Sequence, residues 1–265
     1  LLHLFYKEKY DFFVINIEHG IRGEESMRDL EFVRKFANEN NLRFEFERGF
    51  LGENASEEKA RKARYDFLKA LAERENAEIF TAHHKNDLAE TFVLNLNRGG
   101  GWRAIACFDS PNIKRPFLKF SKAEILNKAQ EKGLKWCEDS TNLSGKYARN
   151  RIRKKINFSE EDLNKIFEIW QKQIKIKREI EEITNDILSK IGDGRKFERN
   201  FFRNNSDEVC AEILREIMRI QSGKIPLSKQ IANFLQAIRT FKNGSKTQIL
   251  SGREVKFYRD EFEFF

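Results

Sequence analysis

Short apolar runs alternate with longer amphipathic segments over the first hundred residues, and this order leaves few folds open. Runs and segments follow one another at residues 12–17, 25–40, 42–47, 54–75, 77–82 and 86–98. The runs are rich in Phe, Val and Ile and are short enough for buried strands, whereas the segments have helical spacing. Strand and helix in regular alternation predict an α/β fold, with a parallel sheet covered by helices on both faces.

The regular alternation ends at Gly99, and we place a second, smaller module after residue 158. We expect loops at 99–120 and 192–207, helices at 121–132, 159–191, 208–221 and 226–241, and a β-hairpin from 243 to 265. The predicted domains are therefore residues 1–158, a catalytic α/β domain, and residues 159–265, a helical α+β module.

Composition excludes several classes of protein. Hydrophobic residues make up 40% and charged residues 35% of the chain, which is typical of a globular protein. The three cysteines (107, 137 and 210) form no CxxC pair, so a disulfide framework and a cysteine zinc site are disfavoured and a reducing cytoplasm is the simplest setting. We find no signal peptide and no apolar stretch that is long enough for a membrane helix. A net charge of +8 weakly favours an acidic partner.

The segment from His83 to Asp87 follows a predicted strand and opens a predicted helix. Ligands of parallel sheets bind beyond the carboxyl ends of the strands, and main-chain amides at a helix start favour anions. Asn86 is expected to cap the helix, Asp87 to hold Mg²⁺, and His83 or His84 to contact a phosphate or carry a proton. The alternative is that Asn86 and Asp87 only cap the helix while the histidines pack.

Three further groups are candidates for anion binding. Arg98 precedes the glycines Gly99 to Gly101, which suit either a helix end or the close approach of a ligand to the backbone. Arg61 and Arg64 share one side of a predicted helix and are placed to clamp one anion, although such a face is most often simply solvated. Residues 149–155 hold five basic side chains, which fit a nucleic-acid backbone or a solubilising helix.

Taken in order, these segments resemble the tRNA(Ile)-lysidine synthases, a branch of the PP-loop ATP pyrophosphatases. The resemblance rests on segments at residues 19–23, 61–65, 81–84 with Asp87, Glu90 and Thr91, 98–101, 115–116, 133–139, 140–142 and 149–153, and in the final hairpin region on Gly244 and Val255. The resemblance covers nearly the whole chain. It implies ATP-dependent ligation of free lysine to C2 of the wobble cytidine of an isoleucine tRNA, through an adenylated intermediate.

The resemblance also implies roles for individual residues, with ATP and Mg²⁺ as cofactors. The expected catalytic residues are His83, His84 and Asp87, and Asp87 is the expected magnesium ligand. Nucleotide contacts are expected from Glu90, Arg98, Gly99 and Gly101. Contacts with tRNA or the activated base are expected from Arg61, Arg64, Arg115, Asp139, Asn142, Arg149, Asn150 and Arg153, and from the module at 159–265. A homodimer would be in keeping with the family.

The sequence departs from the family pattern at its start. The SGGxDS loop that binds the ATP phosphates in these enzymes has no counterpart among the 265 residues, and Leu1 to Leu4 resemble the helix that follows it. We therefore expect an exposed sheet edge and apolar surface near this position. Glu18 stands where the family usually has Asn. The alternatives to a lysidine synthase recorded from an internal start are another PP-loop enzyme that modifies tRNA bases, and a truncated chain that binds tRNA without catalysis.

Overall fold

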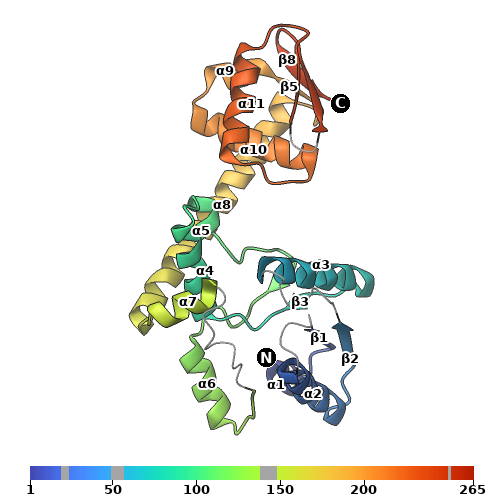
Figure 1. The fold of residues 1–265 in the computed structure, drawn as a ribbon, viewed down its shortest axis with the longest axis vertical. Coiled ribbons are helices and arrows are strands. Elements are labelled where there is room, and N and C mark those ends of the chain that lie inside the picture. The colour runs from blue at the N-terminus through green and yellow to red at the C-terminus, as the bar shows by residue number, and fades with distance from the viewer. Residues whose placement is uncertain (19–23, 49–56, 138–147, 250–251) are drawn as a thin grey trace. The chain divides into compact units, whose positions relative to one another are not determined.

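The computed structural model describes residues 1–18, 24–48, 57–137, 148–249 and 252–265 (Figure 1). Inside these ranges, the side chains of residues 18, 24–26, 48, 57, 58, 148–150 and 154 lie outside the description. The chain forms two compact units, Leu1–Ile174 and Lys175–Phe265. We predicted a division at residue 158, whereas the contacts divide the long helix α8 (Glu160–Ile191) between the units.

The first unit alternates helices and strands, as the apolar pattern predicts. Before α8 its elements are α1 (Leu2–Lys7), β1 (Val14–Glu18), α2 (Glu24–Glu39), β2 (Phe44–Arg48), α3 (Glu57–Glu75), β3 (Ile79–Phe80), α4 (Lys85–Asn97), α5 (Trp102–Ile105), β4 (Ile113–Lys114), α6 (Lys122–Glu131) and α7 (Ala148–Lys155). Strand β1 pairs in parallel with β2, and β3 pairs in parallel with β4. In the described part of the chain these pairs form two separate sheets rather than the single sheet that we predicted.

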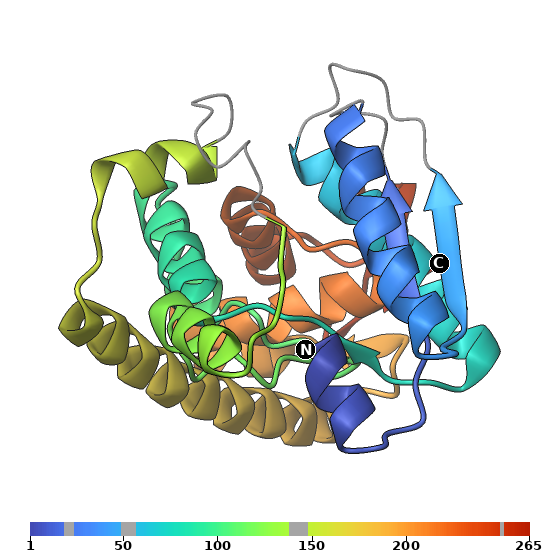
Figure 2. The same ribbon diagram turned by 90° about the horizontal axis from the view of Figure 1, so that it is seen from below.

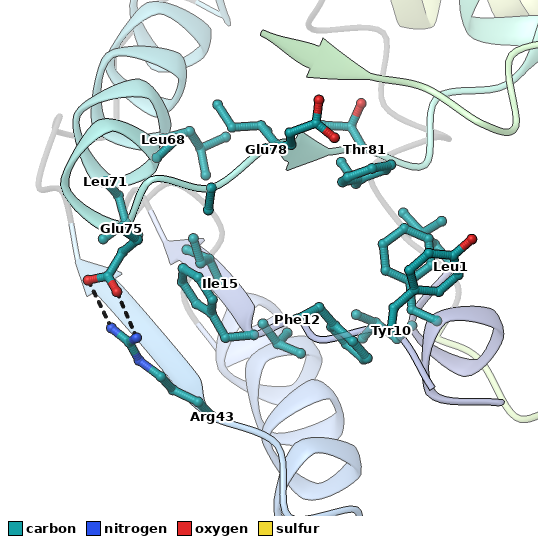
Figure 3. Close-up of a pocket in the computed structure, with 18 of the residues that line it drawn as sticks. Leu1, Tyr10, Phe12, Ile15, Arg43, Leu68, Leu71, Glu75, Glu78 and Thr81 are labelled. Carbon is teal, nitrogen blue, oxygen red and sulfur yellow. Dashed lines mark hydrogen bonds and ion pairs between the residues drawn. The ribbon is translucent and has the colours of Figure 1, made fainter. Parts of the chain in front are cut away.

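A cavity of about 810 Å³ lies where the two strand pairs do not meet (Figure 3). Its apolar lining comes from α1, β1, α3 and β3, and includes Leu2, Ile15, Leu68, Leu71 and Ile79. Strands β1 and β3 each have a partner on one edge only within the described residues. The apolar surface that we expected beside the strand edges is present as this cavity.

Helix α2 covers the β1–β2 pair and buries Leu30 and Ala37 (Figure 2). An ion pair joins the start of β2 to α3. Arg43, just before the strand, has its Nη1 atom 2.8 Å from Glu75 Oε2. The hydrogen bonds from Arg43 and Arg74 lower the pKa of Glu75 to about 2.

Two short elements, α5 and β4, lie in the segment 99–120 that we predicted as a loop. The following helix, α6, begins where the sequence indicates. Ser121 caps it by accepting a hydrogen bond from the Glu124 amide at 3.2 Å, and Glu124 accepts one from the Ser121 amide at 2.6 Å. This reciprocal pair is a capping box, which satisfies two amides that the first helical turn leaves free.

The second unit packs helices against an antiparallel sheet. After α8 its elements are β5 (Lys196–Glu198), α9 (Arg199–Asn204), α10 (Asp207–Ser222), α11 (Ser228–Thr240), β6 (Lys246–Gln248), β7 (Glu254–Phe257) and β8 (Glu261–Phe264). The strand order is β5-β8-β7-β6. The prediction of a loop at 192–207 was wrong, since β5 and α9 lie there, and the expected two-stranded hairpin has three strands.

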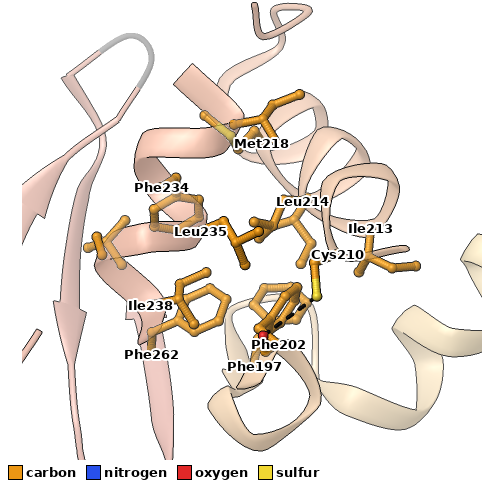
Figure 4. Packing of buried hydrophobic residues seen from close by; sticks show 14 of the residues in the cluster. Phe197, Phe202, Cys210, Ile213, Leu214, Met218, Phe234, Leu235, Ile238 and Phe262 are labelled. Atoms are coloured by element: carbon orange, nitrogen blue, oxygen red, sulfur yellow. Dashed lines mark hydrogen bonds between the residues drawn. The ribbon is translucent and has the colours of Figure 1, made fainter. Parts of the chain in front are cut away.

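Phenylalanine and aliphatic side chains together form the core of the second unit (Figure 4). Strands β5, β7 and β8 alternate inward aromatic with outward charged residues, so Phe197, Phe257, Phe262 and Phe264 face α10 and α11. Burying a side chain of this size stabilises a fold by about 1.5–3 kcal/mol. The alternation therefore explains why so short a sheet is stable.

No helix in the described ranges is long and apolar enough to cross a bilayer.

Candidate active site

The loop between β3 and α4 places His83, His84 and Asp87 at the carboxyl end of a parallel strand. His84 is the N-cap residue of α4, with extended backbone angles (φ −126°, ψ 179°). The prediction that Asn86 caps this helix was therefore wrong. Its Oδ1 atom instead accepts a hydrogen bond from the Lys122 amide at 2.8 Å, which fastens the start of α6 to the start of α4.

Asp87 and His84 hold each other at the first turn of α4. The His84 amide donates to Asp87 Oδ2 at 2.9 Å, and His84 Nδ1 lies 3.5 Å from the same oxygen. Burial lowers the pKa of His84, while the charge of Asp87 acts in the opposite direction. The imidazole is therefore neutral at pH 7, so one ring nitrogen is free to accept a proton.

Helix α7 is attached to α4 through buried charge. Arg153 of α7 forms an ion pair with Glu90, whose side chain is only 4% exposed, and its Nη2 lies 3.5 Å from Asp87 Oδ1. Ile152 is buried beside it. The structure pairs Glu90 with Arg153, and the nucleotide contact expected of Glu90 and the tRNA contact expected of Arg153 stay predictions. This pair fixes the basic helix beside the His83–Asp87 loop.

A second group gathers around the ring of Phe108. Its centroid lies 5.0 Å from that of His83, 5.0 Å from Arg115 Cζ and 6.0 Å from Arg61 Cζ. His83 Nδ1 lies 2.8 Å from the Thr81 hydroxyl oxygen, so a hydrogen bond fixes the imidazole ring. Three predicted site residues, from three separate segments, thus meet at a phenylalanine that no sequence motif indicated.

The remaining predicted residues lie elsewhere. We expected Arg61 and Arg64 to share one anion, but Arg64 lines the cavity between the strand pairs. The guanidinium that shares the Phe108 ring with Arg61 is that of Arg115. Arg98 is exposed at the end of α4. Gly99 has a left-handed φ of 68°, and Gly101 caps α5, so the glycine run forms the turn between α4 and α5.

Four predicted tRNA contacts lie outside the described side chains. Asp139 and Asn142 fall outside the described residues, and Arg149 and Asn150 are placed only as backbone of α7. The side chain of Glu18 is also outside the description. Within the described ranges, no three His, Cys, Asp or Glu side chains gather as a metal site.

Comparison with known proteins gives the family. A model of the PP-loop domain matches residues 1–160. The tRNA(Ile)-lysidine synthase of Rickettsia bellii (strain OSU 85-389) is 30% identical over 236 residues, which cover 82% of this chain and 54% of that protein. The tRNA(Ile)-lysidine synthase of Thermosipho africanus (strain TCF52B) is 35% identical over 230 residues, covering 82% of this chain and 53% of that protein.

A third similar protein is the tRNA(Ile)-lysidine synthase of Thermotoga sp. (strain RQ2), at 40% identity over 158 residues, or 56% of this chain and 38% of that protein. The chain spans about half the length of the first two relatives. Identity at this level over four fifths of the chain, together with the PP-loop match, shows that the chain belongs to the tRNA(Ile)-lysidine synthase family of PP-loop proteins.

Proposed function

We propose that this chain carries the catalytic site of a tRNA(Ile)-lysidine synthase. In the proposed reaction, O2 of a wobble cytidine attacks the α-phosphorus of ATP and pyrophosphate leaves. The ε-amine of free lysine then attacks C2 and loses a proton, and AMP leaves with O2. Family membership of the matched region supports the reaction class.

The observation that carries the proposal is the convergence of His83, His84 and Asp87 at the carboxyl end of β3. In parallel sheets this edge is where ligands bind. His84 is neutral there because burial lowers its pKa, so it suits removal of the proton that the attacking lysine amine loses.

We propose Asp87 as the ligand for Mg²⁺. Magnesium in nucleotide sites is usually bound by one or two carboxylates together with phosphate oxygens and water. Asp87 Oδ2 accepts a hydrogen bond from the His84 amide, while Oδ1 forms a long ion pair with Arg153 Nη2 at 3.5 Å, which a bound Mg²⁺ would have to displace. We propose that Asp87 and the start of α4 form part of the ATP site.

Basic helix α7 and the second unit are the proposed contacts for tRNA. Arg153 is engaged with Glu90, so we assign RNA contact first to Arg149 and Arg151 of the same helix, and a positioning role to Arg153. We further propose the isoleucine tRNA with a C wobble base and free lysine as substrates, a cytoplasmic location, and a homodimer, which sedimentation of the purified chain tests.

The experiment is incorporation of labelled lysine into an isoleucine tRNA transcript with C at the wobble position, with ATP and Mg²⁺. The matched control is the same transcript with U at that position. Incorporation into the C transcript alone supports the proposal. If no lysine is incorporated by this chain or by a version joined to an SGGxDS-bearing segment before Leu1, the proposal is refuted.

A further inference from the structure

Two arginines and a histidine surround the ring of Phe108. Arg61 comes from α3, His83 follows β3 and Arg115 follows β4, and all three lie within 6.0 Å of the Phe108 ring by the distances given above. The Tyr65 ring extends the group, with Arg61 Cζ 4.9 Å from its centroid. Since β3 and β4 are paired in parallel, the residues after them lie at the same sheet edge as the start of α4.

The backbone of Phe108 is held in a strained conformation. Its φ is 61°, in the left-handed region that a bulky side chain rarely adopts. Two hydrogen bonds keep it there: Arg115 Nη1 donates to the Phe108 carbonyl at 2.7 Å, and Trp170 Nε1 of α8 donates to the Cys107 carbonyl at 2.6 Å. Strain of this kind persists only where the surroundings enforce it, and it concentrates at functional sites.

The two guanidinium groups beside the ring have no carboxylate partner among the described residues. Neither Arg61 nor Arg115 forms an ion pair with a carboxylate in the described part of the chain, and Arg115 Nε is buried without a hydrogen-bond partner there. Burial lowers the pKa of Arg115, the neighbouring Tyr65 side chain acts in the opposite direction, and the positive charge of Arg61 lowers it further. An arginine stays protonated even so. Two guanidinium groups therefore share one partly buried site, which favours an anion.

We propose that Phe108 is a positioning residue that aims Arg61 and Arg115 at a phosphate group of a bound nucleotide. Its π face attracts both cations and so offsets their mutual repulsion, and its carbonyl fixes the direction of Arg115. The forked donors of arginine match phosphate oxygens. The inference rests on the proposed function, because both proposed substrates, ATP and tRNA, supply such a phosphate.

The test is binding of ATP and of the C-wobble isoleucine tRNA, each measured separately, to the whole chain and its Phe108→Leu variant. Leucine keeps most of the apolar volume but removes the π face. We expect affinity for one of the two ligands to fall by about tenfold, and the ligand affected identifies the source of the phosphate. Phe108→Tyr, which keeps the ring, should restore affinity to within about twofold.

Phe120→Leu is the matched control. It also removes a ring that lies beside a cation, since Lys119 Nζ is 5.2 Å from the Phe120 centroid, but this ring is not part of the group around Phe108. The control should leave both affinities unchanged. In an Arg61→Ala background, Phe108→Leu should cost less than about threefold, since the ring then has one cation fewer to position.

The proposal is overturned if Phe108→Leu matches the unaltered chain, or if Phe108→Tyr fails to restore affinity. It is also overturned if Phe108→Leu lowers the affinity as much in the Arg61→Ala background as it does in the unaltered chain. If the unaltered chain binds neither ligand, the proposed function falls as well.

Discussion

Replacing Arg199 with methionine should unfold the second unit at much lower denaturant. The side chain is 1% exposed and makes three hydrogen bonds to main-chain carbonyls, from Nε to Ile238 at 2.7 Å, from Nη1 to Tyr258 at 2.6 Å and from Nη2 to Phe241 at 2.8 Å. The carbonyls of Ile238 and Phe241 lie at the end of α11, and that of Tyr258 follows β7. The guanidinium therefore joins α9 to the end of α11 and to the β7–β8 turn.

The cost follows from the carbonyls that methionine leaves without a donor. A buried acceptor without its partner costs about 1–3 kcal/mol. The bond to Ile238 is fully buried, while those to Tyr258 and Phe241 are partly buried and are open to water in the variant. Removing the buried charge returns part of the loss. We expect a net destabilisation of about 3–5 kcal/mol, a large share of the roughly 5–15 kcal/mol of a whole domain.

Urea unfolding of the whole chain measures this with two probes. All three tryptophans (102, 136 and 170) lie in the first unit, so tryptophan fluorescence reports that unit while circular dichroism reports both. A slope of about 1–1.5 kcal/mol per M predicts a shift of about 3 M in the dichroism component of the second unit, with fluorescence unchanged. Arg259→Met, at an exposed arginine of the same unit, is the control. A shift below about 0.5 M would refute the reasoning.

Three other predictions concern the first unit. Because burial lowers the folded-state pKa of His84, folding stability should fall as pH drops below about 6.5, and His84→Asn should lessen this fall in thermal unfolding from pH 8 to 5. Arg153→Met should destabilise more than Glu90→Gln in urea, by about 3 kcal/mol against about 1, because it strands a buried carboxylate. Gly100→Ala should cost about 1–3 kcal/mol in calorimetry, because its Cβ would lie 2.6 Å from that of Ala104. An unchanged pH dependence of stability in His84→Asn would contradict the first prediction. Equal losses of stability in Arg153→Met and Glu90→Gln would contradict the second, and a stability of Gly100→Ala equal to that of the parent would contradict the third.

Local pattern was sufficient for the elements that bury one face. Helix α10 was predicted at 208–221 and lies at Asp207–Ser222, because its apolar spacing matches the helical repeat. Strand β5 was missed because its three residues form a strand only by pairing with β8, and Phe197 lies opposite Phe262. A pairing over so long a sequence separation leaves no local signal.

The candidate site shows the same limit. His83, His84 and Asp87 are neighbours in sequence, so their proximity was predictable. The ion pair of Glu90 with Arg153 joins α4 to α7, and no spacing rule indicates it. Asn86 was the better N-cap by residue preference. The reciprocal contact between His84 and Asp87 prevailed over that preference, and the carboxylate of Asp87 is fixed by it.

The separation of the two strand pairs bears on how the site is held. The group around Phe108 draws Arg61 from α3, His83 from the segment after β3 and Arg115 from the segment after β4. Helix α8 adds Trp170 from the same unit. None of these contacts passes through the β1–β2 pair. The arginine pair is therefore preorganised without a continuous sheet, whereas any ligand group held by β1 depends on how the space between the pairs is filled.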